Sequence, residues 1–422
     1  MAAGPAGRRS ATRWGIIASG QGGCRIASQL FTRTDNPGID DRIVLINTKD
    51  TDIQESLDRV DAQLALDRDT ITQNHVALFG PGSGAGNDFF DGEQFAQEGF
   101  DEIYRPIENT AQAEALLYLV ALGGGTGNGS TPYVIDQLAQ APGSGAVPEL
   151  DREATWLDGV PQFALAAWPF RGEGVQRYFN AVCGISRLLM REDGSPNADM
   201  TILVSNAHLK RLAENNDDAQ RLQGRGTVSD EDLVNLRIIS ALDLFISAGR
   251  TADDTIDVRD YARQPQARGA YHGTFGVELD KPVGLDIDRA IENAADRTFV
   301  PLDPSTAEAA YVVVRAPEQA VAAGDITSGE VRDAVNEWKR ENDLIGARGM
   351  QTLSTAPGSG NNFDVLVFLA GFDLTPLMEE SNTWERFEAE WENFRQNGSS
   401  DRVSRVDTVI SNLREYRRNL EE

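Results

Sequence analysis

The stretch ALLYLVALGGGTGNGS, residues 115–130, places an apolar run directly before five glycines. Glycine inside a helix or strand lowers stability, so this density requires a reason. One interpretation is a flexible turn. The other is a buried strand followed by a loop whose bare backbone approaches a ligand closely. The segments upstream of this stretch distinguish the two interpretations.

The same pattern of apolar strand, glycine-rich loop and helix occurs twice more. WGIIASG (14–20) runs into GQGGCR (20–25), and HVALFG (75–80) runs into GPGSGAGND (80–88). Loops at the carboxyl ends of parallel strands converge on one crevice. Their backbone N–H groups, and the N-termini of the helices that follow, favour an anionic ligand. The three loops together therefore predict a phosphate-binding site.

Apolar runs alternate with helical patterns along the first half of the chain, which predicts an α/β fold with a doubly wound parallel sheet. A long apolar helix is expected from Ser229, a plausible N-cap, and a smaller α+β domain follows it. We expect strands within 14–20, 42–48, 75–80, 115–125, 161–170, 198–206, 270–279, 309–317, 349–356 and 364–372. The predicted organisation is a flexible N-terminal tail (1–13), a phosphate-binding domain (14–228), a central helix (229–250), a second domain (251–375) and a C-terminal helical tail (376–422).

The charge balance excludes several functions. The 422 residues carry 66 Asp and Glu against 39 Lys and Arg, a net charge of −27. Such a surface suits a halophilic cytoplasm, where molar salt screens self-repulsion; the alternative is simply an acidic protein. It argues against nucleic acid as a partner, because no basic stripe could neutralise phosphates. No apolar run reaches membrane-span length, so a soluble, cytoplasmic protein is expected.

The motifs that are missing narrow the kind of ligand. The two cysteines and three histidines do not cluster at metal-ligand spacing, which argues against a zinc site. No GxxxxGK[ST] occurs, so this is not a P-loop protein. A nicotinamide-binding GxGxxG would need glycine at Arg25, and an oxidoreductase would give the later glycine loops no role.

Four motifs resemble those of the tubulin/FtsZ superfamily, in family order. GGGTGNGS (123–130) resembles G-G-G-T-G-[ST]-G, and GQGGCRI (20–26) is similar to tubulin's G-Q-x-G-x-x-I. PFRGEGVQR (169–177) is similar to P-F-x-F-E-G-x-x-R, with Gly172 at the usual Phe. TIDVRD (255–260) resembles N-x-D-x-x-D, with Thr255 at the usual Asn. The resemblance covers about 14–375. The helical C-terminus leans towards archaeal tubulin-like proteins such as the haloarchaeal CetZ group, with a divergent FtsZ-like group as the alternative.

The resemblance implies that residues 14–228 bind GTP or GDP. The guanine contact would come from Asn235 on the long helix, because an amide serves both donor and acceptor edges; the alternative is a polar residue on a helix face. The remaining nucleotide-binding residues implied by the motifs are Gly20, Gln21, Gly22, Gly23, Arg25, Asn47, Gly84, Ala85, Gly86, Asn87, Gly124, Gly125, Thr126, Gly127, Asn128, Gly129, Glu173 and Arg177.

The resemblance also implies a mechanism. Family subunits stack head to tail, so Asp257 and Asp260 of one subunit would reach the γ-phosphate bound by the next and position the attacking water. The alternative is that both are ordinary surface charges of an acidic protein. Hydrolysis would then depend on filament assembly. Mg²⁺ is expected to be held by the GTP phosphates and water rather than by protein side chains.

The tail contains aromatic and aliphatic residues at helical spacing, from Trp384 to Phe394 and from Val403 to Leu420. Packing against the body is one interpretation, and a face for regulators or membrane adaptors is the other. The expected function is a filament-forming GTPase in cell shape or division. The alternative is a GTP-binding regulator that does not polymerise.

Overall fold

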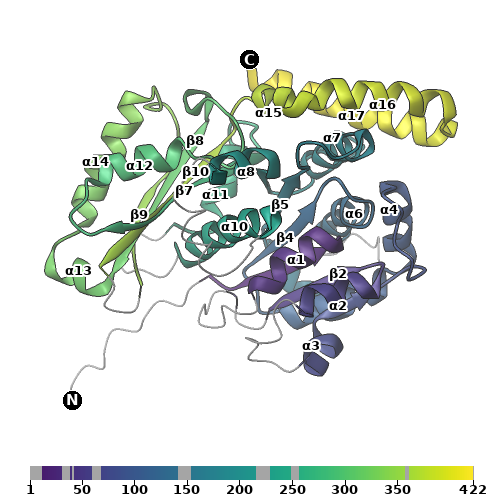
Figure 1. Cartoon of the computed structure of the whole chain (residues 1–422), viewed down its shortest axis with the longest axis horizontal. Helices are drawn as coiled ribbons and strands as arrows, with labels where there is room; N and C mark the ends of the chain where they lie inside the picture. The colour runs from purple at the N-terminus through teal and green to yellow at the C-terminus, as the bar shows by residue number, and fades with distance from the viewer. Residues whose placement is uncertain are drawn as a thin grey trace.

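The computed structural model describes residues 12–30, 39, 42–58, 68–140, 154–214, 229–248, 256–356 and 361–421 (Figure 1). The flexible tail predicted for residues 1–13 lies outside the described residues as far as residue 11. Thr255, at the start of the fourth motif, also lies outside them.

Within these described residues, ten strands form one sheet in the order β3-β2-β1-β4-β5-β6-β7-β10-β8-β9. Each strand overlaps one of the predicted ranges, because a strand buried on both faces is an apolar run. The seventh strand continues beyond its predicted range to Pro282, and the tenth begins before its range, at Asn362. The strands are β1 (Trp14–Ser19), β2 (Ile43–Asn47), β3 (Val76–Leu78), β4 (Ala115–Ala121), β5 (Gln162–Trp168), β6 (Met200–Ser205), β7 (His272–Pro282), β8 (Ala309–Pro317), β9 (Gln351–Ala356) and β10 (Asn362–Ala370).

The strand pairing divides the sheet into two parts. Strands β1 to β6 pair in parallel throughout, with Ile16 opposite Ile43 on one side and Leu117 on the other. Beyond them, β10 pairs antiparallel with β7 and β8, and β9 pairs parallel with β8. This arrangement confirms the predicted fold class. The two parts also share a parallel junction between β6 and β7, at Thr201 and Ile202.

Helices cover both faces of the sheet (Figure 1). Short 3-10 helices span Glu108–Thr110, Ala154–Leu157, Pro304–Thr306 and Glu380–Asn382. The α-helices are α1 (Gly20–Leu30), α2 (Asp50–Asp58), α3 (Arg68–Asn74), α4 (Phe89–Glu98), α5 (Phe100–Ile107), α6 (Thr126–Gln140), α7 (Val175–Leu189), α8 (Asn206–Glu214), α10 (Asp230–Ser247), α11 (Asp260–Gln266), α12 (Ile287–Ala295), α13 (Glu318–Ala323), α14 (Ser328–Glu341), α15 (Thr375–Glu379), α16 (Thr383–Asn397) and α17 (Ser400–Glu421).

A separate hydrophobic cluster lies on each face of the sheet. Because side chains alternate along a strand, Trp14 and Ile16 of β1 pack in one cluster and Ile17 packs in the other. Helices α1 and α10 contribute to the first cluster, and α6, α7, α12, α16 and α17 contribute to the second. The core therefore has three layers, with the sheet in the middle.

Helix α10 is the predicted long helix, and it packs against both parts of the sheet. Ser229 caps it, since its Oγ accepts a hydrogen bond of 3.2 Å from the backbone N–H of Asp232. The helix contacts α1 and α8 as well as β7, β8 and β10. Leu242 and Phe245 are fully or almost fully buried, as the apolar sequence of this helix predicts.

The C-terminal helices pack against the body. Figure 1 shows α16 and α17 side by side along α7. Phe387 of α16 is fully buried and stacks on Phe179 of α7, with ring centroids 5.6 Å apart. Trp391 and Leu413 are also buried, which confirms that these faces pack in the core. No helix in the described part of the chain is long and apolar enough to cross a bilayer.

Candidate functional site

A cavity of about 440 Å³ opens at the carboxyl ends of the parallel strands. Its walls come from the segments that follow β1, β2, β3, β4, β5 and β6, so the predicted glycine loops do converge. Of the residues predicted from the motifs, those lining the cavity are Gly20, Gln21, Gly22, Arg25, Gly84, Ala85, Gly86, Asn87, Gly124, Gly125, Thr126, Gly127, Glu173, Arg177 and Asn235.

Two of the glycine segments run directly into the starts of helices. Helix α1 begins at Gly20, directly after β1, and α6 begins at Thr126, four residues earlier than the predicted start at Ser130. Gly22 and Gly23 therefore lie in the first turn of α1 and Gly127 and Gly129 in that of α6, whereas residues 123–125 form the turn that leads into α6. The backbone N–H groups of a first turn have no partner within the helix, so both helices present free donors and a positive dipole end to the cavity.

Close packing explains why these first turns contain glycine. A Cβ on Gly20 would lie 2.9 Å from the backbone N of Gly127, and one on Gly22 would lie 2.5 Å from the Cβ of Ala121. A hydrogen bond of 2.6 Å between the hydroxyls of Thr48 and Thr126 joins the segment after β2 to α6. The two helix starts and this hydrogen bond fix the floor of the cavity.

The second glycine loop, residues 80–88, forms another wall. Gly84, Gly86 and Asn87 all have positive φ, at 86°, 57° and 62°. Only glycine adopts this conformation freely, and asparagine tolerates it better than most residues. Asp88 then caps α4 by accepting a hydrogen bond of 2.8 Å from the N–H of Phe90.

Asn180 of α7 ties this loop to the third glycine segment. Its Nδ2 donates to the carbonyl oxygen of Asn87 at 2.8 Å and to that of Gly123 at 3.1 Å. Asn180 is fully buried, so these hydrogen bonds form in a shielded environment. The walls contributed by residues 84–87 and 123–127 are therefore held at a fixed separation.

The opposite end of the cavity is lined by α10. Asn235 is only 5% exposed, and its Nδ2 has no hydrogen-bond partner among the described residues. A buried donor without a partner is costly, and a bound ligand with an acceptor would satisfy it. Asn206, at the start of α8, lines the same cavity and adds a second amide.

Arg25 lies between the glycine segments and α10. Its guanidinium holds Glu231 of α10 with two hydrogen bonds, of 2.9 and 2.8 Å, and approaches Glu55 of α2 at 3.3 Å. Burial opposes its charge, but the hydrogen bonds and negative charges of Glu231 and Glu55 outweigh burial and raise the Arg25 pKa. Arg25 thus fixes α1 against α10 at the cavity wall.

Residues 169–174 close another side. Gly172 has a φ of 97°, and the carboxylate of Glu173 accepts a hydrogen bond of 2.9 Å from the N–H of Phe170. Arg177 lies 3.2 Å from Glu173. The glycine at position 172, where the family pattern usually has Phe, therefore lies in a turn that requires a left-handed backbone.

Four predicted binding residues do not line the cavity. A Cβ on Gly23 would lie 2.1 Å from the carbonyl of Leu119, and one on Gly129 would lie 2.3 Å from that of Phe89, so both glycines permit close packing. Asn128 donates to the carbonyls of Leu122 and Asn180. Asn47 is 1% exposed and accepts a hydrogen bond from the N–H of Thr48. The structure places these four residues behind the wall, where they support it.

Asp257 and Asp260 also lie away from the cavity of their own chain. Asp257 is exposed and accepts a hydrogen bond of 2.8 Å from the N–H of Arg259. Asp260 begins α11, and its carbonyl oxygen accepts a hydrogen bond of 2.6 Å from the hydroxyl of Tyr311. Neither aspartate is among the lining residues.

Several lining residues escaped the sequence analysis. Some of them, such as Ser83 and Phe170, lie within the quoted motifs but were not assigned a role, and others, such as Asn206 and Lys49, lie outside any motif. Asn206 and Lys49 could have been predicted as lining residues, because each lies just after a parallel strand. The missed residues are Ser19, Ile26, Lys49, Asp52, Ser83, Ala121, Ala167, Pro169, Phe170, Asn206 and Glu231.

The donor set of the cavity suits a phosphorylated ligand more than a metal cage. Its walls offer first-turn N–H groups, the Thr126 hydroxyl and the cations Lys49 and Arg177. Among the described residues, no group of three or more His, Cys, Asp or Glu side chains comes together as a metal site.

Comparisons with known proteins agree with this geometry. Residues 14–214 match the sequence model of the family described as Tubulin/FtsZ family, GTPase domain. The chain is 31% identical over 234 residues to the cell division protein FtsZ of Methanothermobacter thermautotrophicus, a match covering 55% of this chain and 51% of that protein. It is 25% identical over 312 residues to the tubulin-like protein CetZ2 of Haloferax volcanii, covering 71% of this chain and 74% of that one.

A solved structure shows the same fold. The GTPγS-bound protofilament of CetZ2 from Haloferax volcanii superposes with a TM-score of 0.67 at 19% identity, covering 91% of this chain and 100% of that one. The family match spans the strands, glycine segments and helix starts that form most of the cavity. The chain therefore carries a GTPase domain of the tubulin/FtsZ family in residues 14–214.

Proposed function

We propose that this protein binds GTP in the cavity and hydrolyses it in head-to-tail filaments. The observation that carries the proposal is the convergence of three glycine segments, two of them leading into helix N-termini, on one cavity. The β- and γ-phosphates would lie against the N–H groups of α1, α6 and residues 84–87. Mg²⁺ would be held by the phosphates and water, neutralising part of their charge.

The guanine base would lie at the end of the cavity that α10 lines. The buried, unpartnered Nδ2 of Asn235 would donate to the guanine carbonyl, and Asn206 offers a second amide nearby. Adenine carries an amino group where guanine carries the carbonyl, so it would leave the Asn235 donor unsatisfied. The cost of a buried unsatisfied donor would then favour GTP over ATP.

Hydrolysis would require a second subunit. Asp257 and Asp260 lie outside the cavity of their own chain, so they act on a nucleotide only if another copy presents them. Their role would be to position and polarise the attacking water, since phosphoryl transfer depends mainly on positioning and electrostatics. A head-to-tail contact joins different surfaces and does not close, so it produces a filament. The solved CetZ2 structure described above is itself a protofilament.

The cellular role follows from relatives and from charge. The relatives include a cell division protein and a tubulin-like protein, so we propose a cytoskeletal role in cell shape or division. The net charge of −27 and the scarcity of lysine favour a halophilic archaeon as the source.

The decisive test is GTP turnover against protein concentration in molar KCl, with sedimentation in parallel. We expect turnover per subunit to rise above a critical concentration, together with pelleting. Asp257→Ala should bind GTP but turn it over slowly, while Asp325→Ala, another exposed aspartate of the second domain, should behave as the wild type. Tight GTP binding without concentration-dependent turnover or pelleting would favour a regulator that does not polymerise.

A further inference from the structure

The C-terminal helices contact two of the segments that form the cavity and are linked to a third, α6, through a chain of charged side chains. We propose that α16 and α17 are a positioning element of the nucleotide site, and that Arg402 holds the second glycine loop in its binding conformation. The inference rests on the proposed nucleotide site. It assigns a role to helices that lie outside the matched domain, which ends at residue 214.

Arg402 connects α17 to the end of the second glycine loop. Its two terminal nitrogens contact Asp88 Oδ2 at 2.8 Å and Asp91 Oδ1 at 2.7 Å. Asp88 directly follows the left-handed residues Gly86 and Asn87, which line the cavity, and it also caps α4. A backbone in sparsely populated conformations persists only when its surroundings hold it. The Arg402 guanidinium supplies such a restraint at the first residue after the loop.

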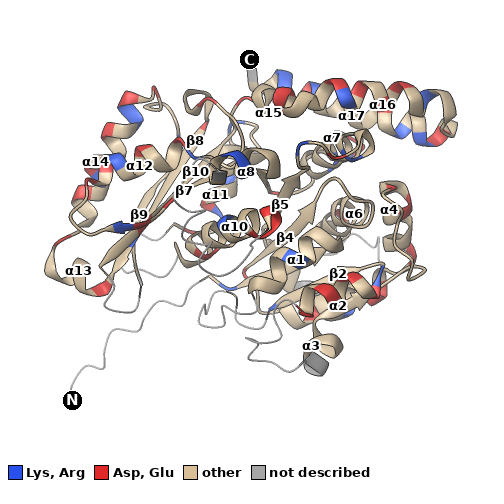
Figure 2. Ribbon diagram, in the orientation of Figure 1, with Lys and Arg blue, Asp and Glu red and all other residues tan. Residues whose placement is uncertain are grey.

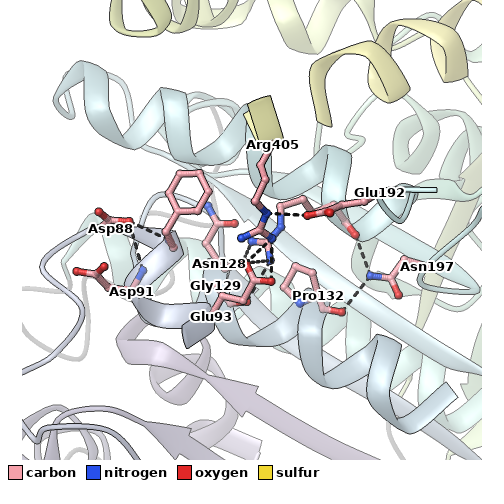
Figure 3. A network of polar contacts seen from close by, with 11 residues as sticks. Asp88, Asp91, Glu93, Asn128, Gly129, Pro132, Glu192, Asn197 and Arg405 are labelled. Carbon is pink, nitrogen blue, oxygen red and sulfur yellow. Dashed lines mark hydrogen bonds and ion pairs between the residues drawn. The ribbon is translucent and has the colours of Figure 1, made fainter. Parts of the chain in front are cut away.

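Arg405 connects α17 to the helix that carries the third glycine segment. Figure 3 shows Arg405 extending to Glu93 and Glu192. Glu93, only 7% exposed, also lies 2.9 Å from the buried guanidinium of Arg187. Arg187 in turn donates to the carbonyl oxygen of Asn128 at 3.1 Å, in the first turn of α6. This chain of charged contacts links the tail to α6 through α4 and α7.

Arg386 of α16 provides the third contact. It donates a hydrogen bond of 3.2 Å to the carbonyl oxygen of Glu173 and lies over the ring of Tyr178, 4.6 Å from its centroid. Glu173 lines the cavity. Figure 2 shows basic residues alternating with acidic ones along α16 and α17. The arginines of the tail therefore reach the body at the second loop, at α6 by way of Glu93, and at the Glu173 turn.

Through these contacts, docking of the tail and binding of the nucleotide are thermodynamically coupled. A tail that holds the loop in its binding conformation reduces the ordering that the nucleotide must impose. By linkage, bound nucleotide then stabilises the docked tail to the same extent. Loss of Arg402 should therefore weaken nucleotide binding, although Arg402 is not a lining residue.

The test uses GDP and a double-mutant cycle. We expect Arg402→Gln to raise the Kd for GDP about fivefold, Asp91→Asn to raise it less because the contact of Arg402 with Asp88 remains, and the double variant to match Arg402→Gln alone. Arg402→Gln also removes the contact of the guanidinium with the ring of Phe90, so Asp91→Asn is included to test an ion pair of Arg402 without disturbing that contact. Arg395→Gln is the matched control, since Arg395 pairs with Asp407 at 2.8 Å within the tail and should leave the Kd unchanged.

Hydrogen exchange without nucleotide supplies a second readout. Arg402→Gln should accelerate exchange of the amides of residues 82–88, and Arg395→Gln should not. If the wild type binds GDP and both single variants keep its Kd, or if their effects add, the positioning role is overturned. If hydrogen exchange at residues 82–88 is unchanged in Arg402→Gln, the restraint by Arg402 is also overturned. If the wild type binds no GDP, it is instead the proposed function that fails.

Discussion

The stability of the fold should depend on pH through one buried histidine that contacts α17. His272 of β7 is fully buried, and its Nδ1 lies 2.7 Å from the hydroxyl of Tyr416 in α17. Its Nε2 donates to the carbonyl of Phe372 at 2.8 Å, so the neutral ring carries its proton there and accepts from Tyr416. Burial lowers the His272 pKa to about 4. The hydrogen bond to Phe372 and the charge of Asp373 act in the opposite direction, but they are smaller than the effect of burial.

The magnitude follows from linkage. The pKa falls from an ordinary value of 6.5 to about 4 in the fold, so the unfolded chain binds a proton at a higher pH than the folded one. The stabilisation from the neutral ring is therefore complete above pH 6.5 and is lost as the pH falls towards 4. From pH 7 to pH 5 the free energy of unfolding should drop by about 2 kcal/mol through His272 alone.

Urea unfolding at pH 7 and pH 5 in molar KCl measures this drop. His272→Gln should lose about 2 kcal/mol less than the wild type over this interval, since both share every other titrating group. Tyr416→Phe is the control: it keeps the buried imidazole and should retain the pH dependence, while its stability at pH 7 falls by about 1 kcal/mol. Equal losses in the wild type and His272→Gln would refute the assignment.

Three further predictions concern packing, recognition and capping. Gly129→Ala should lower the free energy of unfolding by about 1–3 kcal/mol and with it the melting temperature, because the new Cβ would lie 2.3 Å from the carbonyl oxygen of Phe89. Gly174→Ala is the control, since open space surrounds Gly174, and it should leave the melting temperature nearly unchanged. Asn235→Ala should weaken GTP binding by about 1–3 kcal/mol and reduce the preference for GTP over ATP in competition titrations; an unchanged preference would exclude it from base recognition. Ser229→Ala should cost about 1 kcal/mol in urea unfolding through loss of the α10 cap, and no change would show that the cap is replaceable.

The sequence predicted the strands and the converging glycine segments because both carry a local signal. A strand buried on two faces is a continuous apolar run, and glycine density marks a backbone that approaches something closely. Local signals do not separate residues that line the cavity from residues that lie behind it. Gly23, Asn128 and Gly129 belong to the same motifs as the lining residues. Only the packing of α1 on β4 and of α4 on α6 shows that these three lie behind the residues that line the cavity.

Contacts between distant residues left no such signal. Arg25 and Glu231 are 206 residues apart, and Arg402 and Asp88 are 314 apart. Neither pair produces a periodicity, and an acidic chain offers many carboxylates to any arginine. The pairing of β6 with β7, which joins the two parts in one sheet, was equally hidden, since two adjacent residues fix it.

The separation between Arg402 and Asp88 sets an order of events during synthesis. Domains generally fold from the N-terminal side as the chain emerges, at about 5–20 residues per second. The 314 residues between the two partners then amount to about 15–60 s in which the glycine loop exists without its arginine. Once β6 has been made, a nascent chain has the parallel strands of its nucleotide site but still lacks the contact of Arg402 with the loop. Ribosome-bound chains should accordingly hold nucleotide more weakly than released ones.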